Sequence, residues 1–148
     1  MDVVRIPITR LTSSEVPLPE YFSPGAAGMD LAAALGEPLP LAPGEFTLVP
    51  CGFAVAIPKG FEGQIRPRSG LASRHGITVL NAPGTIDSDY RGEVKVLLIN
   101  HSRVPFTITP NMRVAQLLVA RVVRVEWEQT DLLPPTERGD GGFGHTGH

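Results

Sequence analysis

The sequence predicts an all-β protein, on the evidence of its glycine content, its proline content and the spacing of its glycines. The 148 residues include 16 glycines and 15 prolines, about a fifth of the chain, and both residue types interrupt helix interiors. Glycines recur every eight residues in two runs, as turns between short strands do. A hydrophobic fraction of 42% is sufficient for one domain with a core. The glycines of the two runs are Gly28, Gly36, Gly44, Gly52 and Gly60, then Gly76, Gly84 and Gly92.

The first part of the chain is expected to hold short strands between long loops. A strand is predicted over residues 3–9, where Pro7 favours a position at a sheet edge. Residues 12–44 are rich in proline, glycine and alanine and are expected to form loops with short extended pieces. Further strands are predicted at residues 46–50 and 53–57.

One short helix is expected near residues 69–76, between two strands. Residues 61–68 alternate between apolar and polar side chains, which is typical of a strand with one buried face. Ser69 is a candidate N-cap of the helix, and Gly76 is expected to end it. A strand is predicted again over residues 77–80.

Three more strands are predicted in the C-terminal half. Residues 92–100 and 104–109 are two of them, joined by a polar turn. The third covers residues 112–128, whose second half alternates strictly between apolar and charged side chains. A helix over residues 115–124 is the alternative, but the density of valine favours a strand.

A glycine-rich segment without strand pattern follows. We divide the chain into a β-barrel-like subunit, residues 1–130, and a mobile C-terminal arm, residues 131–148. Residues 139–144 match G-x-G-x-x-G, but neither a preceding strand nor a following helix is predicted, which excludes a dinucleotide-binding turn. Two interpretations remain open. The segment is either a solvated tail or an arm whose glycine amides surround a phosphate, assisted by Arg138 and Phe143.

Composition excludes several classes of protein. The single cysteine, Cys51, excludes an intramolecular disulfide and is compatible with the reducing cytoplasm, where we expect the protein. No apolar run approaches about 18 residues, so a membrane-spanning segment is not expected. A net charge of −2 provides no broad attraction to nucleic acid. The spacing of the four histidines does not indicate a zinc site.

Polar side chains concentrate at three places. Arg68 and Ser69 precede the predicted helix, where they form either an anion site or an ordinary cap. Residues 81–92 combine two carboxylates and a tyrosine with an apolar residue, which indicates a loop with an inward-facing side. Asp30 is a lone acid in an apolar stretch and is either a turn residue or a functional one.

Taken together, these segments resemble, in order, the five motifs of the trimeric deoxyuridine triphosphate pyrophosphatase (dUTPase) family. The resemblance runs from about residue 20 to the C-terminus. It implies an all-β, jelly-roll-like subunit of the β-clip type and a homotrimer with active sites at subunit interfaces. The matching segments are residues 26–31 (AAGMDL), 67–72 (PRSGLA), 81–92 (ending GTIDSDYRG), 113–117 (RVAQL) and 138–144 (RGDGGFG).

The resemblance also implies a reaction and roles for individual residues. dUTP and water would yield dUMP and pyrophosphate, with Mg²⁺ bound through the triphosphate, which keeps uracil out of DNA and supplies dUMP for dTMP synthesis. Asp87 would be the general base for the attacking water, and Tyr90 would pack under the deoxyribose and reject a 2′-hydroxyl. The hairpin with Asn81 would bind the uracil edge, and Asp30 would act on Mg²⁺ through water.

The remaining implied contacts concern the phosphates and the arm. Arg138 would act as an arginine finger on the γ-phosphate while the arm closes over the active site, with Phe143 over the uracil ring. Phosphate oxygens would be held by Arg68, Ser69, Gly70 and Gln116. The other expected substrate contacts are Gly84, Thr85, Ile86, Lys95, Gly144, His145 and Thr146.

Two positions depart from the family pattern. Asn111 and Met112 precede Arg113, where the family usually has a glycine and an acid, and Asn111 is expected to preserve the turn because asparagine tolerates the left-handed conformation. His145 stands where a serine is common, so its backbone amide, or its protonated ring below about pH 6.5, would replace the hydroxyl contact.

Two other functions are alternatives to dUTP hydrolysis. A dCTP deaminase-related enzyme would release ammonia from dCTP, but residues 84–92 and the Arg138 arm match the pyrophosphatase pattern better. A non-catalytic nucleotide-binding relative is expected to have lost the base or the arm, and this chain retains Asp87 and Arg138.

Overall fold

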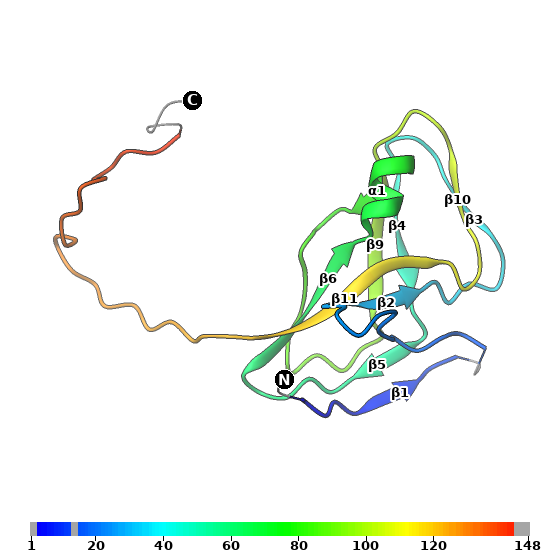
Figure 1. Cartoon of the computed structure of the whole chain (residues 1–148), viewed down its shortest axis with the longest axis horizontal. Helices are drawn as coiled ribbons and strands as arrows, with labels where there is room; N and C mark the ends of the chain where they lie inside the picture. Colours follow the sequence, from blue (N-terminus) through cyan, green and yellow to red (C-terminus); the bar gives the residue numbers. More distant parts are fainter. Residues whose placement is uncertain (1–2, 13–14, 144–148) are drawn as a thin grey trace.

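The computed structural model describes residues 3–12 and 15–143, and strands dominate their regular structure (Figure 1). Within these residues the one helix, α1 (Ser69–His75), separates β6 from β7. The all-β class predicted from the glycines is therefore confirmed. The strands are β1 (Ile8–Arg10), β2 (Met29–Ala32), β3 (Leu39–Leu41), β4 (Phe46–Pro50), β5 (Phe53–Val55), β6 (Phe61–Pro67), β7 (Ile77–Val79), β8 (Gly84–Ile86), β9 (Lys95–Asn100), β10 (Phe106–Ile108) and β11 (Arg113–Arg121).

Two antiparallel sheets form the body of the subunit (Figure 1). The larger sheet has the order β2-β11-β6-β8, and the smaller has the order β4-β9-β7. The strands β1 and β5 form a separate antiparallel pair, as do β3 and β10. Because neighbours such as β2 and β11 are far apart in the chain, these pairings are jelly-roll-like rather than a series of hairpins.

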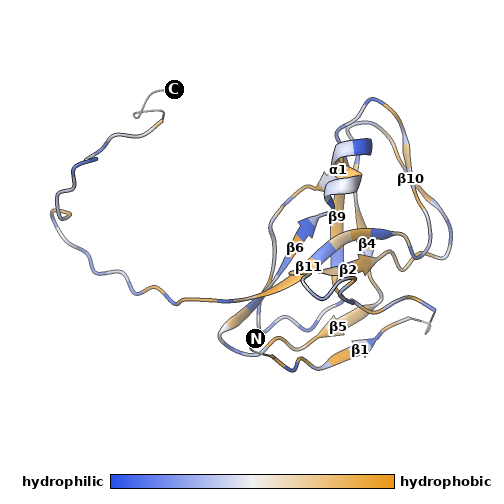
Figure 2. Cartoon of the chain, in the orientation of Figure 1, coloured by the Kyte–Doolittle hydropathy of each residue, from blue (hydrophilic) through white to orange (hydrophobic). Residues whose placement is uncertain are grey.

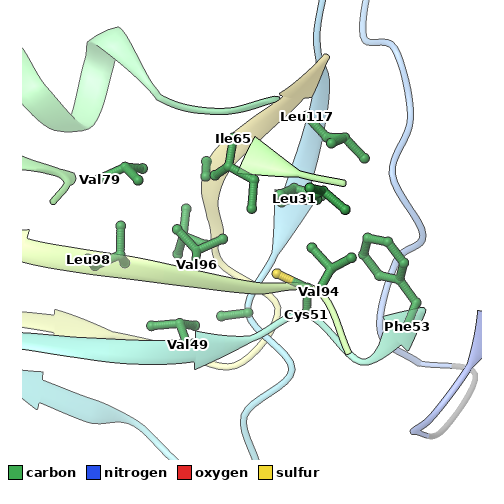
Figure 3. Close-up of a cluster of buried hydrophobic side chains, with 14 of the residues drawn as sticks. Leu31, Val49, Cys51, Phe53, Ile65, Val79, Val94, Val96, Leu98 and Leu117 are labelled. Atoms are coloured by element: carbon green, nitrogen blue, oxygen red, sulfur yellow. The ribbon is translucent and has the colours of Figure 1, made fainter. Parts of the chain in front are cut away.

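One hydrophobic core joins the two sheets, and Figure 3 shows side chains from both in a single cluster. Hydropathy follows this arrangement, since hydrophobic residues run along β5 and β9 (Figure 2). In β6, Ile65 is buried and Arg66 is exposed, which confirms the alternation predicted for this segment. The core residues include Leu31, Ile65 and Leu117 from the larger sheet and Val49, Val96 and Leu98 from the smaller.

The polar turn after β9 is held by Asn100, whose side chain is fully buried. Its Nδ2 donates to the carbonyl oxygens of Leu41, at 3.0 Å, and Val104, at 2.8 Å. Its Oδ1 accepts a hydrogen bond of 2.9 Å from the amide of Ser102. Both the nitrogen and the oxygen of the side-chain amide have hydrogen-bond partners, so burying this polar group does not cost stability through unsatisfied hydrogen bonds.

Local predictions were wrong at several places. Ser69 is the first helical residue, and Arg68 occupies the N-cap position without a side-chain cap bond, whereas Gly76 ends the helix in the left-handed conformation, as predicted, with φ 64°. β1 covers only Ile8–Arg10, because only these residues pair with β5. β8 lies inside residues 81–92, where no strand was expected, and it pairs with β6.

The predicted strand over residues 112–128 ends at Arg121, where its pairing with β6 ends opposite Phe61. The amide of Val122 still donates to the carbonyl oxygen of Gly60 at 3.0 Å, and the chain that follows runs away from the body (Figure 1). Its alternation is present in the sequence, but the side chains of Val123 and Trp127 are 89% and 92% exposed because no strand of the described chain lies beside them. No described residue belongs to a helix long and apolar enough to cross a membrane.

Candidate active site

A buried carboxylate holds three cationic or amide side chains at one end of the larger sheet. Asp30 lies on β2, directly opposite Gln116 on β11, and Gln116 Nε2 donates to its Oδ1 at 3.0 Å. Arg113 Nη1 donates to Asp30 Oδ2 at 3.1 Å, and Arg68 Nη2 lies 3.4 Å from the same oxygen. Residues from the first, second and fourth sequence motifs therefore meet in one group, which we call the Asp30 cluster.

The backbone around Arg113 fits this arrangement. Asn111 has a φ of 63°, so asparagine does adopt the left-handed conformation expected of it before the fourth motif. The register of β11 then shifts between Arg113 and Ala115. The carbonyl oxygen of Arg113 accepts a hydrogen bond of 3.0 Å from Arg68 Nη1, so Arg68 contacts both Asp30 and the turn.

Phe22 adds an aromatic face to the Asp30 cluster. The guanidinium carbon of Arg113 lies 4.4 Å from the centroid of the Phe22 ring, within the range of a cation–π contact. Sequence reasoning missed Phe22 and gave no separate role to the Arg113 side chain. The position of Arg113 in the fourth motif could have indicated a role for its side chain. No local pattern marks Phe22, because its partner, Arg113, is distant in the chain.

The Asp30 cluster is suited to an anion. Two guanidinium groups face one carboxylate, so the group carries a net positive charge. The side chains of Arg68 and Arg113 remain 28% and 45% exposed and can reach a ligand in solvent. Guanidinium groups bind phosphate oxygens through forked, charge-assisted hydrogen bonds. Ser69 is exposed and Gly70 half-buried, immediately after Arg68.

The second part of the site is a cavity of about 450 Å³ beside β8. It brings together the predicted uracil-binding, sugar-binding and catalytic residues of the third motif, and also Lys95. Gly84 leaves space for Asn81, because a Cβ at residue 84 would lie 3.3 Å from Asn81 Nδ2. The lining residues are Leu48, Ile65, Asn81, Gly84, Thr85, Ile86, Asp87, Tyr90, Glu93, Val94, Lys95 and Leu97.

Asp87 and Tyr90 are joined by a tight turn at the mouth of this cavity. The amide of Tyr90 donates to the carbonyl oxygen of Asp87 at 3.1 Å, and both side chains are exposed. Arg91 Nη1 donates to the carbonyl oxygens of Ser88, at 2.7 Å, and Tyr90, at 2.8 Å, which fixes the loop from its outer side. A carboxylate that is open to solvent beside a pocket is in a position to act on a water molecule.

The Asp30 cluster and the cavity are connected through β6, which lies between β11 and β8. On β6, Arg66 pairs with Gln116 of β11, and Gln64, two residues earlier, pairs with Thr85 of β8. These side chains share one face of the sheet, which runs from the Asp30 cluster to the cavity.

Arg138 and Phe143 lie on the C-terminal segment that extends away from the body (Figure 1). Arg138 Nε donates to the carbonyl oxygen of Gly141 at 2.7 Å. The expected contacts at Gly144, His145 and Thr146 lie outside the described residues.

The Asp30 cluster is cationic, as suits phosphates, and the cavity beside β8 has polar and apolar walls, as suits a nucleoside. An all-β subunit with these two features is typical of the nucleotide-binding β proteins. The family model described as dUTPase matches residues 14–147, and the chain belongs to that family.

Curated relatives agree with this assignment. The deoxyuridine 5′-triphosphate nucleotidohydrolase of Rickettsia felis is 51% identical over 147 residues, which cover 99% of both chains. The protein of the same name from Rickettsia akari is 50% identical over the same length and the same shares.

Solved structures show the same fold. The dUTPase of Staphylococcus bacteriophage 80alpha with dUPNHPP has a TM-score of 0.86 and 24% identity, over 99% of this chain and 100% of that one. A mutant dUTPase from phage phi11 of S. aureus, described with a coordinated structural Mg(II) ion, has a TM-score of 0.76 and 22% identity, over 87% and 98%.

Proposed function

We propose that this protein hydrolyses dUTP to dUMP and pyrophosphate. The observation that carries the proposal is the single cavity in which Asn81, Asp87 and Tyr90 meet. Family membership and two relatives of about 50% identity that are named for this activity support it. Such a reaction requires positioning and charge neutralisation more than covalent catalysis.

In the proposed mechanism, Asp87 accepts a proton from a water molecule as the water oxygen bonds to the α-phosphorus. The bond between that phosphorus and the oxygen bridging to the β-phosphorus breaks, and pyrophosphate leaves with the bond electrons. Asn81 and the Gly84–Ile86 strand would bind the uracil edge, and the Tyr90 ring would pack under the deoxyribose. A general base of this kind contributes roughly 10²- to 10⁴-fold to the rate.

The Asp30 cluster is the proposed phosphate site, with Arg68, Arg113 and Gln116 as donors. Their bonds to Asp30 hold the donors in position before the substrate arrives, which reduces the cost of ordering them on binding. Arg138 on the arm would add a further cation at the γ-phosphate, and an arginine finger contributes roughly 10³- to 10⁵-fold in phosphoryl transfer. Phe143, together with the residues that follow it, would close over the base.

Mg²⁺ would neutralise charge on the triphosphate when it is bound. Among residues 3–12 and 15–143, no group of three His, Cys, Asp or Glu side chains is placed to hold a metal ion. The donor set fits a cation held mainly by phosphate oxygens, with Asp30 contributing through water, because its carboxylate already accepts hydrogen bonds from Arg113 and Gln116 and forms an ion pair with Arg68.

We also propose a homotrimer in the cytoplasm. The alternating apolar side chains of Val123, Val125 and Trp127 are exposed in the single chain, and a neighbouring subunit would cover them. The arm extends away from its own body, so it would reach an active site on another subunit (Figure 1). Cys51 is a free, buried thiol, which suits a reducing compartment.

One assay tests the proposed activity. The full chain is incubated with Mg²⁺ and, in turn, dUTP, dCTP, dTTP or UTP, while pyrophosphate and ammonia are measured. We expect pyrophosphate from dUTP and little from the other three nucleotides. Ammonia from dCTP would instead indicate a deaminase, and no product from any nucleotide would indicate a binding protein. Native mass spectrometry of the same sample tests the trimer.

A further inference from the structure

The ring of Tyr90 is held on two sides by the residues that follow it. Its hydroxyl donates to the carbonyl oxygen of Glu93 at 2.9 Å. The ring also lies against Gly92 so closely that a Cβ at residue 92 would be 2.6 Å from its Cζ atom. A glycine is therefore required at position 92 for the ring to occupy this place.

Glu93 is itself anchored to a buried turn. Its Oε1 accepts a hydrogen bond of 3.0 Å from the amide of Gly52, a residue with a φ of 75°. The next residue, Val94, is fixed by a bond from its amide to the Phe53 carbonyl oxygen, at 2.9 Å, and by one from the Cys51 amide, at 3.0 Å. The hydroxyl of Tyr90 is thus tied to an acceptor that cannot move without disturbing the core.

This restraint matters because Tyr90 is 45% exposed and lines the open cavity together with Asp87. A half-exposed tyrosine that nothing restrains exchanges between rotamers. A side chain can exclude a substrate hydroxyl group by steric clash only if the side chain cannot move aside. Fixing the ring would therefore determine how well a ribonucleotide is rejected.

We infer that Gly92 and Glu93 are positioning residues that clamp the Tyr90 ring and thereby set the discrimination between dUTP and UTP. The inference rests on the proposed function, in which the ring packs under the deoxyribose. The clamp has two parts. The first is the hydrogen bond from the Tyr90 hydroxyl to the backbone carbonyl oxygen of Glu93, whose carboxylate is anchored to Gly52. The second is the packing of the ring against Gly92, which has no side chain to displace it.

The first test compares kcat/KM for dUTP and UTP in matched variants. Tyr90→Phe retains the ring and loses only the hydroxyl, and we expect the dUTP preference to fall roughly 2- to 10-fold, the range for loss of one hydrogen bond. Glu93→Ala should lower the preference in the same direction. Glu93→Gln should preserve it, because the amide oxygen can still accept from Gly52. Tyr21→Phe, which alters the only other tyrosine, is the control and should leave the preference unchanged.

Gly92→Ala tests the second contact. The added methyl group would displace the ring, so the preference should fall at least as far as in Tyr90→Phe. Thermal unfolding of each variant identifies any that fails to fold. An unchanged preference in folded Tyr90→Phe and Gly92→Ala would overturn the inference.

A second readout does not depend on the reaction. Fluorotyrosine is incorporated, and the two ¹⁹F resonances are assigned with Tyr21→Phe and Tyr90→Phe. Without nucleotide, Glu93→Ala and Gly92→Ala should shift the Tyr90 resonance, whereas Glu93→Gln should not. A wild-type protein that hydrolyses neither nucleotide would contradict the proposed function and leave this test of the clamp intact. An unshifted Tyr90 resonance in both variants would contradict the clamp, even in an active dUTPase.

Discussion

Asp30 and Arg113 are 83 residues apart in the chain, yet Arg113 Nη1 lies 3.1 Å from Asp30 Oδ2. The same carboxylate also contacts Arg68 and Gln116, so one acid orients three donors of the proposed phosphate site. A carboxylate in this position would keep two guanidinium groups close together that otherwise repel each other.

Asp30→Asn should therefore weaken phosphate binding. Removing the negative charge leaves Arg68 and Arg113 without their shared partner, and we expect KM for dUTP to rise about tenfold or more. Steady-state kinetics measures the change, and Asp131→Asn, an exposed acid on the C-terminal segment, is the control. An unchanged KM would show that the donors hold their positions without Asp30.

Phe22 should contribute to the same site through Arg113. Phe22→Leu keeps an apolar side chain and loses the ring, and an exposed cation–π contact is worth about 0.5–1 kcal/mol. KM for dUTP should rise roughly 2- to 5-fold, and Phe22→Tyr should restore it. Tyr21→Leu, which changes the neighbouring exposed aromatic residue, serves as the comparison and should have a smaller effect.

Asp87→Asn should separate binding from catalysis. An amide cannot accept the proton from water, so hydrolysis should slow at least about 100-fold while dUTP still binds. Single-turnover kinetics and calorimetric titration measure the two quantities. The neighbouring exposed acid gives a matched control, Asp89→Asn, which should turn over at close to the normal rate. Near-normal hydrolysis by Asp87→Asn would remove it from the role of base.

Deletion of residues 138–148 should abolish activity and leave assembly unchanged. The arm would supply Arg138 and the aromatic face of Phe143, whereas the body of the subunit ends its last strand at Arg121. Pyrophosphate release and native mass spectrometry test the two statements together. A truncated protein that is monomeric, or fully active, would contradict the proposed role of the arm.

Cys51 should make stability fall at high pH. Burial, with a smaller effect of the Glu93 charge, raises the pKa of this thiol from 9.0 to about 12. Between these values the unfolded chain releases the proton and the folded chain retains it, so alkali favours unfolding. Urea denaturation should show a steeper loss of stability from pH 8 to 10 in the wild type than in Cys51→Ala. Equal pH dependence in the two proteins would show that the thiol does not titrate in this way.

Local patterns in the sequence were sufficient for most of the elements and for the segment from which several cavity residues come. The alternation in β6, the glycine that ends α1 and the compact 81–92 segment are each properties of a few consecutive residues. Local patterns do not show which strand pairs with which, or where a pairing ends. The alternation of residues 123–128 is as regular as that of β6, but the ladder with β6 ends at Arg121.

By itself, the sequence determined the all-β class and the five motif segments, because these depend on composition and short spacing. Only the tertiary structure decided that Asp30 is the centre of a cationic cluster, and that Phe22 stacks on Arg113. It also decided that Glu93 holds the hydroxyl of Tyr90 from a turn anchored at Gly52. The physical reason is the same in each case. These contacts depend on sheet pairing that brings distant segments within a few ångströms, and such pairing depends on how the whole core packs rather than on any local pattern.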